Sequence, residues 1–294
     1  MKTSSEGKSH LLITGASGFI GRNLIKELAA DYEITALVRE MPDNPADVNY
    51  VIQDLHDDLD IEATPEVIIH LAHANTTDEE ELFDINVTGT VKLLEFAKAN
   101  NVKRFLYAST GSVYGYGKTP FTEDMPLKPT SPYGSTKVAA ETLAWGYRNH
   151  FEVVIMRLSA PYGEDQQVTR LIPSIIKKVL AEEEVLIYND VGNPRITPTH
   201  IDDVTEMIRR IIETPGSHIL NVGSNEHCSI RELAEYVGTI SGNTPRFALA
   251  IDESRGDIML ESSKVQQLLE YRPRITLEHG LARVCGAVAT NEEL

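Results

Sequence analysis

The chain has 294 residues, with 27 basic and 44 acidic side chains and a formal net charge of −17. Hydrophobic residues make up 41% and charged residues 24% of it, which is typical of a globular protein long enough to bury one large core or two modest ones. Because phosphate-rich partners are bound through Lys and Arg, so acidic a chain argues against nucleic acid and anionic membranes as partners.

The polar start MKTSSEGKSH is not followed by an apolar signal core, and no apolar run approaches the ~18 residues of a membrane-spanning helix. The only two cysteines, Cys228 and Cys285, exclude a disulfide framework and a Cys-rich metal site. Two isolated thiols are typical of a reducing compartment. We therefore predict a cytoplasmic protein without a bound metal.

Short apolar runs alternate with helical patterns through the first half of the chain. The runs are bounded by turn residues and are apolar throughout, which is typical of parallel strands covered on both faces. Repetition of strand, helix and strand predicts an α/β fold built on a doubly wound parallel sheet. The predicted strands cover residues 10–14, 33–38, 50–52, 66–72, 103–109 and 152–158, and the predicted helices cover residues 22–30, 87–101 and 131–150.

The second half is less regular and predicts a smaller C-terminal lobe, with a boundary near residue 165. One of its predicted helices begins with His200, Asp202 and Asp203, which could bind a metal together with a distant His. The favoured interpretation is that the carboxylates lie at the positive end of the helix dipole. The predicted helices cover residues 170–184, 200–214, 229–240 and 262–270, and a predicted strand covers residues 218–224.

The segment TGASGFIG places three glycines at three-residue spacing between the first predicted strand and the first predicted helix. The first lets the chain turn tightly, the second lets backbone N–H groups approach a pyrophosphate, and the third allows close packing of helix and strand. The helix N-terminus favours the anion. The alternative is a tight turn without a ligand, but the βαβ context favours a dinucleotide. The predicted cofactor residues here are Gly15, Ser17, Gly18, Phe19, Ile20, Gly21 and Arg22.

The end of the second predicted strand indicates which dinucleotide binds. An acidic residue about 20 positions after the glycines would bind the ribose 2′-hydroxyl of NAD. Arg39 stands there beside Glu40, and a guanidinium suits the 2′-phosphate of NADP. We therefore prefer NADP, with Arg22 assisting; the alternative is NAD bound through Glu40. Asp54, followed by Leu55, is placed either to accept a hydrogen bond from adenine or to cap a turn.

Tyr133 and Lys137 lie four residues apart at the start of a predicted helix, so their side chains share one face. Such a pair occurs easily by chance, but this one follows the fifth predicted strand, whose end carries Thr110 and Ser112. Ligands bind beyond the carboxyl ends of strands in open α/β sheets. Hydride transfer at a carbinol carbon also moves a proton, and a nearby ammonium lowers the pKa of a phenol. The pattern predicts a catalytic set of Thr110, Tyr133 and Lys137; the alternative is a surface contact and a turn-forming Thr.

Taken together, these motifs resemble the extended branch of the short-chain dehydrogenase/reductase superfamily, the NAD(P)-dependent epimerase/dehydratase group, over nearly the whole chain. The resemblance implies a Rossmann-type NAD(P)-binding domain over residues 1–165. It implies a mainly substrate-binding lobe over residues 166–294, with segments around 195–224 returning to the first domain. The motifs that carry it are TGASGFIG, QDLHD, VIIHLAHAN, NVTGTVKLLEFA, ASTGSVYG, SPYGSTK, MRLSAPYG, RITPTHIDDV and NVGS.

The same resemblance implies roles for individual residues. Tyr133 would be the acid/base, Lys137 its electrostatic partner and a ribose ligand, and Thr110 the third hydroxyl. Tyr133 and Lys137 would therefore also belong to the cofactor-binding residues. Backbone contacts to the cofactor are implied at Leu71 and Ala72. The resemblance further implies a homodimer formed through the predicted helices 87–101 and 131–150.

Two departures from the family pattern narrow the expected activity. Sugar-nucleotide 4,6-dehydratases carry Asp-Glu directly after the catalytic Thr, where this chain has Gly111 and Ser112. Without a carboxylate there, dehydration is disfavoured, as is the related decarboxylation. Many nucleotide-sugar members have Asn where this chain has Ala160, which removes one expected contact to the sugar or phosphate.

Two arginines support a nucleotide-sugar substrate. Arg195 and Arg255 fall where nucleotide-sugar members place diphosphate-binding arginines, and an acidic protein needs fixed cations to hold a diphosphate. The alternative is a pair of surface ion pairs, for example between Arg255 and Asp257 or Glu253. With Ser112, these arginines complete the predicted substrate-binding residues.

We therefore predict an NAD(P)-dependent enzyme that transfers hydride at C4 of a nucleotide-activated sugar, as a 4-ketoreductase or a 4-epimerase, and not as a 4,6-dehydratase. One alternative is a reductase of a small ketone or aldehyde without a nucleotide, which Ala160 motivates. Another is a non-catalytic NADP-sensing protein, against which the intact hydroxyl, phenol and ammonium set argues.

Overall fold

The computed structural model describes residues 7–74, 76–188, 194–252 and 255–291. Its internal contacts divide the chain into two compact units whose segments alternate along the sequence. The first unit contains Met1–Val113, Pro129–Arg157 and Thr205–Leu220, and the second contains Tyr114–Lys128, Leu158–Val204 and Asn221–Leu294.

A seven-stranded sheet forms the centre of the first unit, with the strand order β11-β6-β5-β4-β1-β2-β3. The neighbours from β5 through β3 pair in parallel. The chain winds outward from β1 in one direction and then in the other, which confirms the predicted doubly wound α/β fold. In such a sheet, ligands bind where the winding reverses, here beyond the carboxyl ends of β1 and β4. The strands are β1 (His10–Thr14), β2 (Glu33–Val38), β3 (Asn49–Ile52), β4 (Val67–His70), β5 (Arg104–Thr110), β6 (Glu152–Leu158) and β11 (His218–Val222).

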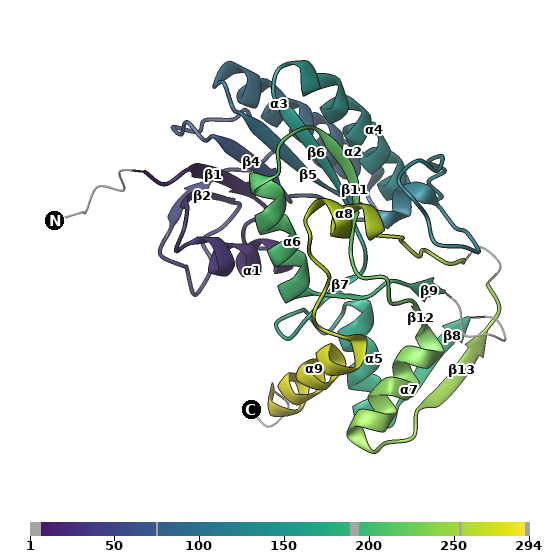
Figure 1. Ribbon diagram of the computed structural model, residues 1–294. Coiled ribbons are helices and arrows are strands. Elements are labelled where there is room, and N and C mark those ends of the chain that lie inside the picture. Colours follow the sequence, from purple (N-terminus) through teal and green to yellow (C-terminus); the bar gives the residue numbers. More distant parts are fainter. Residues whose placement is uncertain (1–6, 75, 189–193, 253–254, 292–294) are drawn as a thin grey trace. The chain divides into compact units, whose positions relative to one another are not determined.

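Helices cover both faces of this sheet, with α3 and α4 along one face and α1 and α6 along the other (Figure 1). The α3 and α4 face is sealed by a buried apolar cluster in which Leu93, Leu94 and Ala140 pack against strand residues such as Ile68 and Phe105. Burial on both faces explains why the strands are continuous apolar runs. The helices are α1 (Phe19–Leu28), α2 (Glu79–Phe83), α3 (Gly89–Ala99), α4 (Pro132–Gly146) and α6 (Ile201–Glu213), and a π-helical turn, Asp84–Thr88, precedes α3.

The second unit has a separate apolar core, formed mainly by α5 (Leu171–Leu180), α7 (Ile230–Ser241) and α9 (Leu277–Asn291). A parallel pair of strands, β8 (Glu184–Tyr188) and β13 (Arg246–Ala250), packs beside them. Among the described residues, no helix is long and apolar enough to cross a membrane. The remaining elements are β7 (Pro161–Tyr162), β9 (Arg195–Ile196), β10 (Thr199–His200), β12 (Cys228–Ser229) and α8 (Ser263–Leu268).

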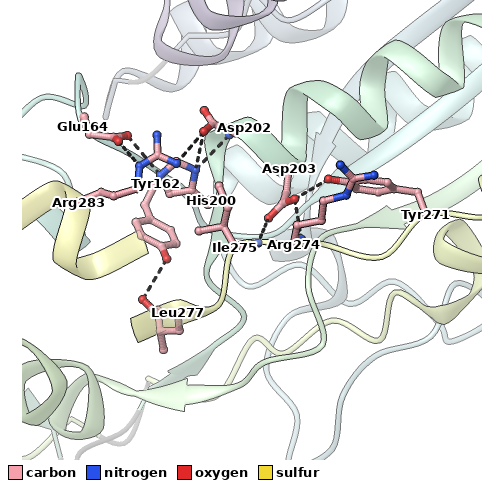
Figure 2. Close-up of polar contacts among 10 residues, drawn as sticks. All are labelled: Tyr162, Glu164, His200, Asp202, Asp203, Tyr271, Arg274, Ile275, Leu277 and Arg283. Carbon is pink, nitrogen blue, oxygen red and sulfur yellow. Dashed lines mark hydrogen bonds and ion pairs between the residues drawn. The ribbon is translucent and has the colours of Figure 1, made fainter. Parts of the chain in front are cut away.

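The start of α6 anchors the C-terminal part of the second unit (Figure 2). The buried Asp203 carboxylate accepts hydrogen bonds from the Tyr271 hydroxyl at 2.6 Å and from the backbone N–H groups of Arg274 and Ile275 at 2.8 and 2.9 Å. Three donors on one carboxylate are enough to hold this chain segment in place. Asp203 therefore has a structural role in this unit.

Asp202, the acidic residue next to Asp203, also has an ion-pair partner. Asp202 pairs with Arg283 at 2.8 Å, and Arg283 pairs in turn with Glu164 (Figure 2). His200 is fully buried, with its Nε2 atom 3.2 Å from Glu164. Across the described ranges, no group of three or more His, Cys, Asp and Glu side chains is placed to hold a metal ion. Of the two carboxylates at this helix start, Asp202 binds helix α9, and Asp203 binds the segment that precedes α9.

Ala160 has a backbone φ of +30°, in the left-handed region that a residue with a Cβ atom adopts at a cost. Because glycine carries no such cost, Ala160→Gly should raise the free energy of unfolding by about 1 kcal/mol, measured by urea denaturation. Ala181→Gly is the matched control, since Ala181 has a φ of −83°, and it should give no gain. Equal losses in both variants would contradict this explanation.

Candidate active site

The glycine turn between β1 and α1 is closely packed against the end of β4. Gly15 has a φ of +65°, and a Cβ atom there would lie 2.6 Å from the backbone nitrogen of Ala72. A Cβ atom on Gly21 would overlap the carbonyl oxygen of Gly15. Only glycine therefore allows the turn, the helix and the strand end to approach one another this closely. Gly18 is the N-cap of α1, so the free backbone N–H groups of the helix begin at this turn.

A cavity of about 190 Å³ opens beside the turn, at the point where the sheet reverses its winding. The turn, the end of β2, the segment after β3 and the segment after β4 all contribute to its wall. A helix N-terminus, a cradle that a Cβ atom would fill, and a cavity bounded by these strand ends fit a dinucleotide. Of the predicted cofactor residues, those that line the cavity are Gly15, Ser17, Gly18, Arg39, Asp54, Leu55, Leu71 and Ala72.

The other predicted cofactor residues of the turn, Phe19, Ile20, Gly21 and Arg22, form the first turn of α1. Arg39 is exposed at the cavity rim. Asp54 lines the cavity and also accepts a hydrogen bond from the backbone N–H of His56 at 3.0 Å. The two interpretations of Asp54 from the sequence are therefore compatible, because capping a turn uses only one of its oxygens.

Tyr133 and Lys137 lie on the first turns of α4, as their spacing predicts. The hydroxyl of Ser131 accepts a hydrogen bond from the backbone N–H of Gly134 at 3.1 Å and so caps this helix. Lys137 is buried, with its Nζ atom 4.2 Å from the centroid of the Tyr107 ring on β5. Tyr133 is half-buried. Helix α4 thus places a phenol near the surface and an ammonium beneath it.

Thr110 ends β5 in the same unit, where its hydroxyl accepts a hydrogen bond from the backbone N–H of Ser112 at 3.2 Å. The two hydroxyl groups are 3.3 Å apart. This turn fixes the Thr110 side chain at the carboxyl end of the strand. The predicted catalytic residues Thr110, Tyr133 and Lys137 all belong to the first unit, together with the glycine turn, but they are not among the residues that line the cavity.

Burial lowers the pKa of Lys137 from an ordinary value of 10.5 to about 7, against an opposing effect of the Glu141 carboxylate. Between these two values the unfolded chain holds a proton that the folded chain has largely released, so stability rises with pH there. Below pH 7 both states are protonated, and the full cost of burying the ammonium remains.

We therefore expect the cofactor-free Lys137→Met variant to be more stable than the wild type at pH 7, with a difference that shrinks as the pH rises toward 10. Urea denaturation at several pH values measures this. Lys103→Met is the matched control, since the Lys103 side chain is 74% exposed, and it should give no gain at pH 7. A Lys137→Met variant that is less stable than the wild type at every pH would contradict the conclusion that burial lowers the pKa of Lys137.

Sequence analysis missed a buried polar network behind these residues. Glu141, one turn after Lys137 on α4, pairs with Arg157 on β6 at 2.8 Å and accepts a hydrogen bond from the Ser109 hydroxyl on β5. All three side chains of the network are at least 95% buried. The network ties α4 to the two strands beneath it. An acidic residue one turn beyond Lys137 is the only signal in the sequence that could have pointed to it.

The two predicted diphosphate-binding arginines lie in the second unit. The guanidinium of Arg195 is 3.1 Å from the carboxylate of Glu232. Arg255 pairs with Asp252 at 3.0 Å, and its guanidinium lies 4.2 Å from the ring centroid of Tyr188. Both arginines therefore have carboxylate neighbours in this structure. The Asp252 partner of Arg255 was not considered from the sequence, and Glu253 lies outside the described residues.

Comparison with known proteins adds independent information. Residues 11–223 match the NAD dependent epimerase/dehydratase family. A dTDP-glucose 4,6-dehydratase of Streptomyces griseus is 30% identical, over 93% of this chain and 92% of its own length. A UDP-glucose 4-epimerase of Mycolicibacterium smegmatis is 29% identical, over 92% of this chain and 96% of its own length. The structure of MoeE5 in complex with UDP-glucuronic acid and NAD has a TM-score of 0.86 and 28% identity, covering 97% of this chain and 100% of MoeE5.

These similarities do not separate the possible activities, because an epimerase and a dehydratase are similar to the chain to almost the same degree. They also give no support to the predicted preference for NADP, since the MoeE5 complex contains NAD. The matched residues run from β1 through β11 and include the glycine turn and the predicted catalytic residues.

Proposed function

Because the chain belongs to the NAD dependent epimerase/dehydratase family, we propose that it transfers hydride at C4 of a nucleotide-activated sugar, as a 4-ketoreductase or a 4-epimerase. The observation that carries the proposal is the buried Lys137, one helical turn from the half-buried Tyr133. Burying an ammonium is costly, and a catalytic role beside a phenol explains why α4 carries it. Thr110, fixed at the end of β5, supplies the third polar group.

Bound NAD(P) supplies the hydride or accepts it through its nicotinamide ring. The residues of the chain handle the accompanying proton. On reduction of a carbonyl, the phenol of Tyr133 donates its proton to the oxygen; on oxidation, the phenolate removes the hydroxyl proton. The ammonium of Lys137 stabilises the phenolate. The hydroxyl of Thr110 hydrogen-bonds to the same substrate oxygen and orients it.

Exclusion of 4,6-dehydration is part of the proposal and rests on two residues. Dehydration of the sugar needs a carboxylate to remove the C5 proton and an acid to protonate the leaving hydroxyl. Gly111 and Ser112 occupy the positions that follow Thr110, and neither can ionise in that way. The similarity to a dehydratase gives this exclusion no support, so the test is whether dTDP-glucose yields a 4-keto-6-deoxy product.

The choice of cofactor depends on Arg39 at the cavity rim. We propose that its guanidinium binds the 2′-phosphate of NADP, in which case Arg39→Ala should weaken NADP binding about tenfold to a hundredfold and leave NAD binding nearly unchanged. Titration calorimetry with both dinucleotides measures this. Glu40→Ala is the complementary control. Weaker NAD binding in Glu40→Ala, with unchanged NADP binding in Arg39→Ala, would assign the site to NAD.

Product analysis with UDP- and dTDP-sugars and their 4-keto forms, in the presence of NAD or NADPH, tests the activity itself. Stoichiometric oxidation of NADPH would identify a 4-ketoreductase. Interconversion of 4-epimers without net consumption of cofactor would identify an epimerase. Reduction of small ketones alone, which the loss of an amide at Ala160 would favour, would overturn the assignment to nucleotide-sugars, and tight binding without any turnover would indicate a sensor.

The proposal includes a homodimer formed through α3 and α4, as the family resemblance implies. Leu143 on α4 is 38% exposed, so this helix offers an apolar side chain to a partner. Light scattering of the purified protein gives the molar mass that tests it. A monomer at all concentrations would contradict this part of the proposal and would leave the assignment of the catalytic residues intact.

A further inference from the structure

His70, the last residue of β4, is 1% exposed and lies between two threonine hydroxyls. Its Nδ1 atom is 2.7 Å from Oγ1 of Thr14 at the end of β1. Its Nε2 atom is 3.0 Å from Oγ1 of Thr90 on α3. A single imidazole thus links three elements. These are β1, which leads into the glycine turn, β4, which leads into the cavity segment 71–74, and helix α3, which covers this face of the sheet.

The hydrogen bonds around His70 fix the position of its proton. The Thr90 hydroxyl donates its only hydrogen to the carbonyl oxygen of Asn86 at 2.7 Å, so toward His70 it can only accept. The proton of the ring is therefore on Nε2, and Nδ1 accepts the hydrogen of Thr14. The Thr14 oxygen accepts in turn from the backbone N–H of Ala72 at 3.2 Å.

The ring is held in its neutral form. Burial lowers the pKa of His70 well below its ordinary value, and the charges of Lys137 and His73 act in the same direction. A neutral ring with its proton on Nε2 satisfies both threonines and leaves no ring nitrogen without a partner. The other neutral form would turn a lone pair of Nε2 toward a hydroxyl that has no hydrogen to give.

The chain of hydrogen bonds continues to the helix that carries Tyr133. Asn86 lies in the π-helical turn before α3, a rare conformation that often occurs at functional sites. Its side-chain oxygen accepts from the backbone N–H of Ala74 at 2.9 Å, and its side-chain nitrogen donates to the Thr136 hydroxyl at 3.0 Å. The Thr136 hydroxyl donates to the carbonyl oxygen of Tyr133 at 2.9 Å.

We propose that His70 is a positioning residue for the dinucleotide site, because with Thr14 and Thr90 it holds the segment 71–74 at a fixed distance from the glycine turn and from α4. Leu71, Ala72 and Ala74 line the cavity, and the backbone of Ala72 is the part that Gly15 approaches most closely. A small shift of this segment would therefore change the cavity directly. The inference rests on the proposed function only in taking the cavity as the binding site of NAD(P).

Thr90→Val is the sharpest test, because Thr90 is fully buried and is not part of the cavity wall. The variant removes the acceptor of the His70 proton at nearly constant side-chain volume. Thr35→Val is the matched control: Thr35 is 1% exposed and its hydroxyl is 2.8 Å from Nε2 of His10, in the same sheet but outside the cavity. Thr90→Ser keeps the hydroxyl and should restore the wild-type behaviour.

We expect Thr90→Val and Thr35→Val to lower the urea midpoint by similar amounts. Only Thr90→Val should weaken binding of NAD or NADP, by about tenfold, and accelerate hydrogen exchange of the Ala72 and Ala74 amides in the cofactor-free protein. If Thr90→Val does not fold, His70→Asn provides a second break, because its shorter side chain can reach Thr14 but not Thr90.

Unchanged dinucleotide binding and unchanged exchange in the Thr90→Val variant would overturn the inference and leave His70 with a purely structural role. The proposed function can fail separately. If the wild type binds neither dinucleotide, the exchange of the 71–74 amides still decides whether His70 positions this segment. Equal exchange in Thr90→Val and Thr35→Val would then reject the inference.

Discussion

Replacing Tyr133 with Phe should lower kcat about a thousandfold while changing the dissociation constant of NAD(P) by less than about twofold. The substitution removes only the phenolic oxygen, which is the group that exchanges a proton with the substrate. The ring remains, so its contact with the His73 ring, at a centroid distance of 6.1 Å, is retained. Steady-state kinetics and titration calorimetry on the same preparation give both quantities.

Tyr147→Phe is the control for this experiment. Tyr147 follows α4 directly, and its hydroxyl donates to the exposed Glu95, so the loss of that oxygen should leave kcat within about twofold of the wild type. A Tyr133→Phe variant that retains a tenth or more of the wild-type kcat would contradict the assignment of the acid/base. Loss of dinucleotide binding in the same variant would show that Tyr133 acts mainly in the binding site.

Replacing Glu141 with Gln should lower the free energy of unfolding by about 3–5 kcal/mol, because it removes the carboxylate that pairs with the buried Arg157 at 2.8 Å. Arg157 is 3% exposed and Glu141 is 4% exposed, so neither charge can recover its hydration without local unfolding. The Ser109 hydroxyl also loses its carboxylate acceptor. Urea denaturation measures the change.

Two further variants isolate the cause of that loss. Glu66→Gln breaks the exposed pair with Lys103, whose lysine side chain is 74% exposed, and should cost less than about 1 kcal/mol. The double variant Glu141→Leu/Arg157→Met replaces both charges with apolar side chains and should recover much of the stability lost in Glu141→Gln. A double variant that is less stable than Glu141→Gln would show that packing, and not the loss of the Glu141 carboxylate, dominates.

The seven-stranded sheet was predictable because five of its strands, β1, β2, β4, β5 and β6, are buried over most of their length. The edge strand β3 is not buried. Continuous apolar runs such as HLLIT and EVVIMRL have no other simple explanation when glycines and polar helices separate them. Their bounds agree with β1 and β6 residue for residue. The first helix was predicted from Arg22 but begins at Phe19, because the N-cap Gly18 carries no side chain that marks a helix start.

Elements of the second unit were harder to predict. The strand β13 reads RFALA, in which Leu249 is 57% exposed, so its pattern does not show a buried face. Helix α9 contains Gly280 and Gly286, which weaken the helical signal, and it depends on packing of its apolar residues into the core. The predicted helix 170–184 ends at Leu180, because Glu182 adopts a φ of +55° before β8 begins.

In the candidate site, too, some features were predictable from the sequence and others were not. Tyr133, Lys137 and the glycine turn are predictable because their spacing follows the geometry of one helix and one turn. Glu141 was not assigned a role, and the hydrogen bonds of His70 were not foreseen, because their partners Arg157 and Thr90 lie 16 and 20 residues away along the chain. The packing of α3 and α4 against the sheet brings those partners together. Contacts between a helix and a distant strand are invisible to a periodicity argument.

The central claim is that hydride moves between C4 of a nucleotide-sugar and a nicotinamide bound at the glycine turn. A nucleotide-sugar carrying deuterium at C4 tests this most directly, with the label followed by mass spectrometry during a single turnover. The account predicts that deuterium appears on the nicotinamide ring in the wild type and not in Tyr133→Phe. An epimerase then returns the label to C4 of its product. Deuterium that is released to water, or that is never found on the nicotinamide when the turnover is quenched before its end, would contradict the account.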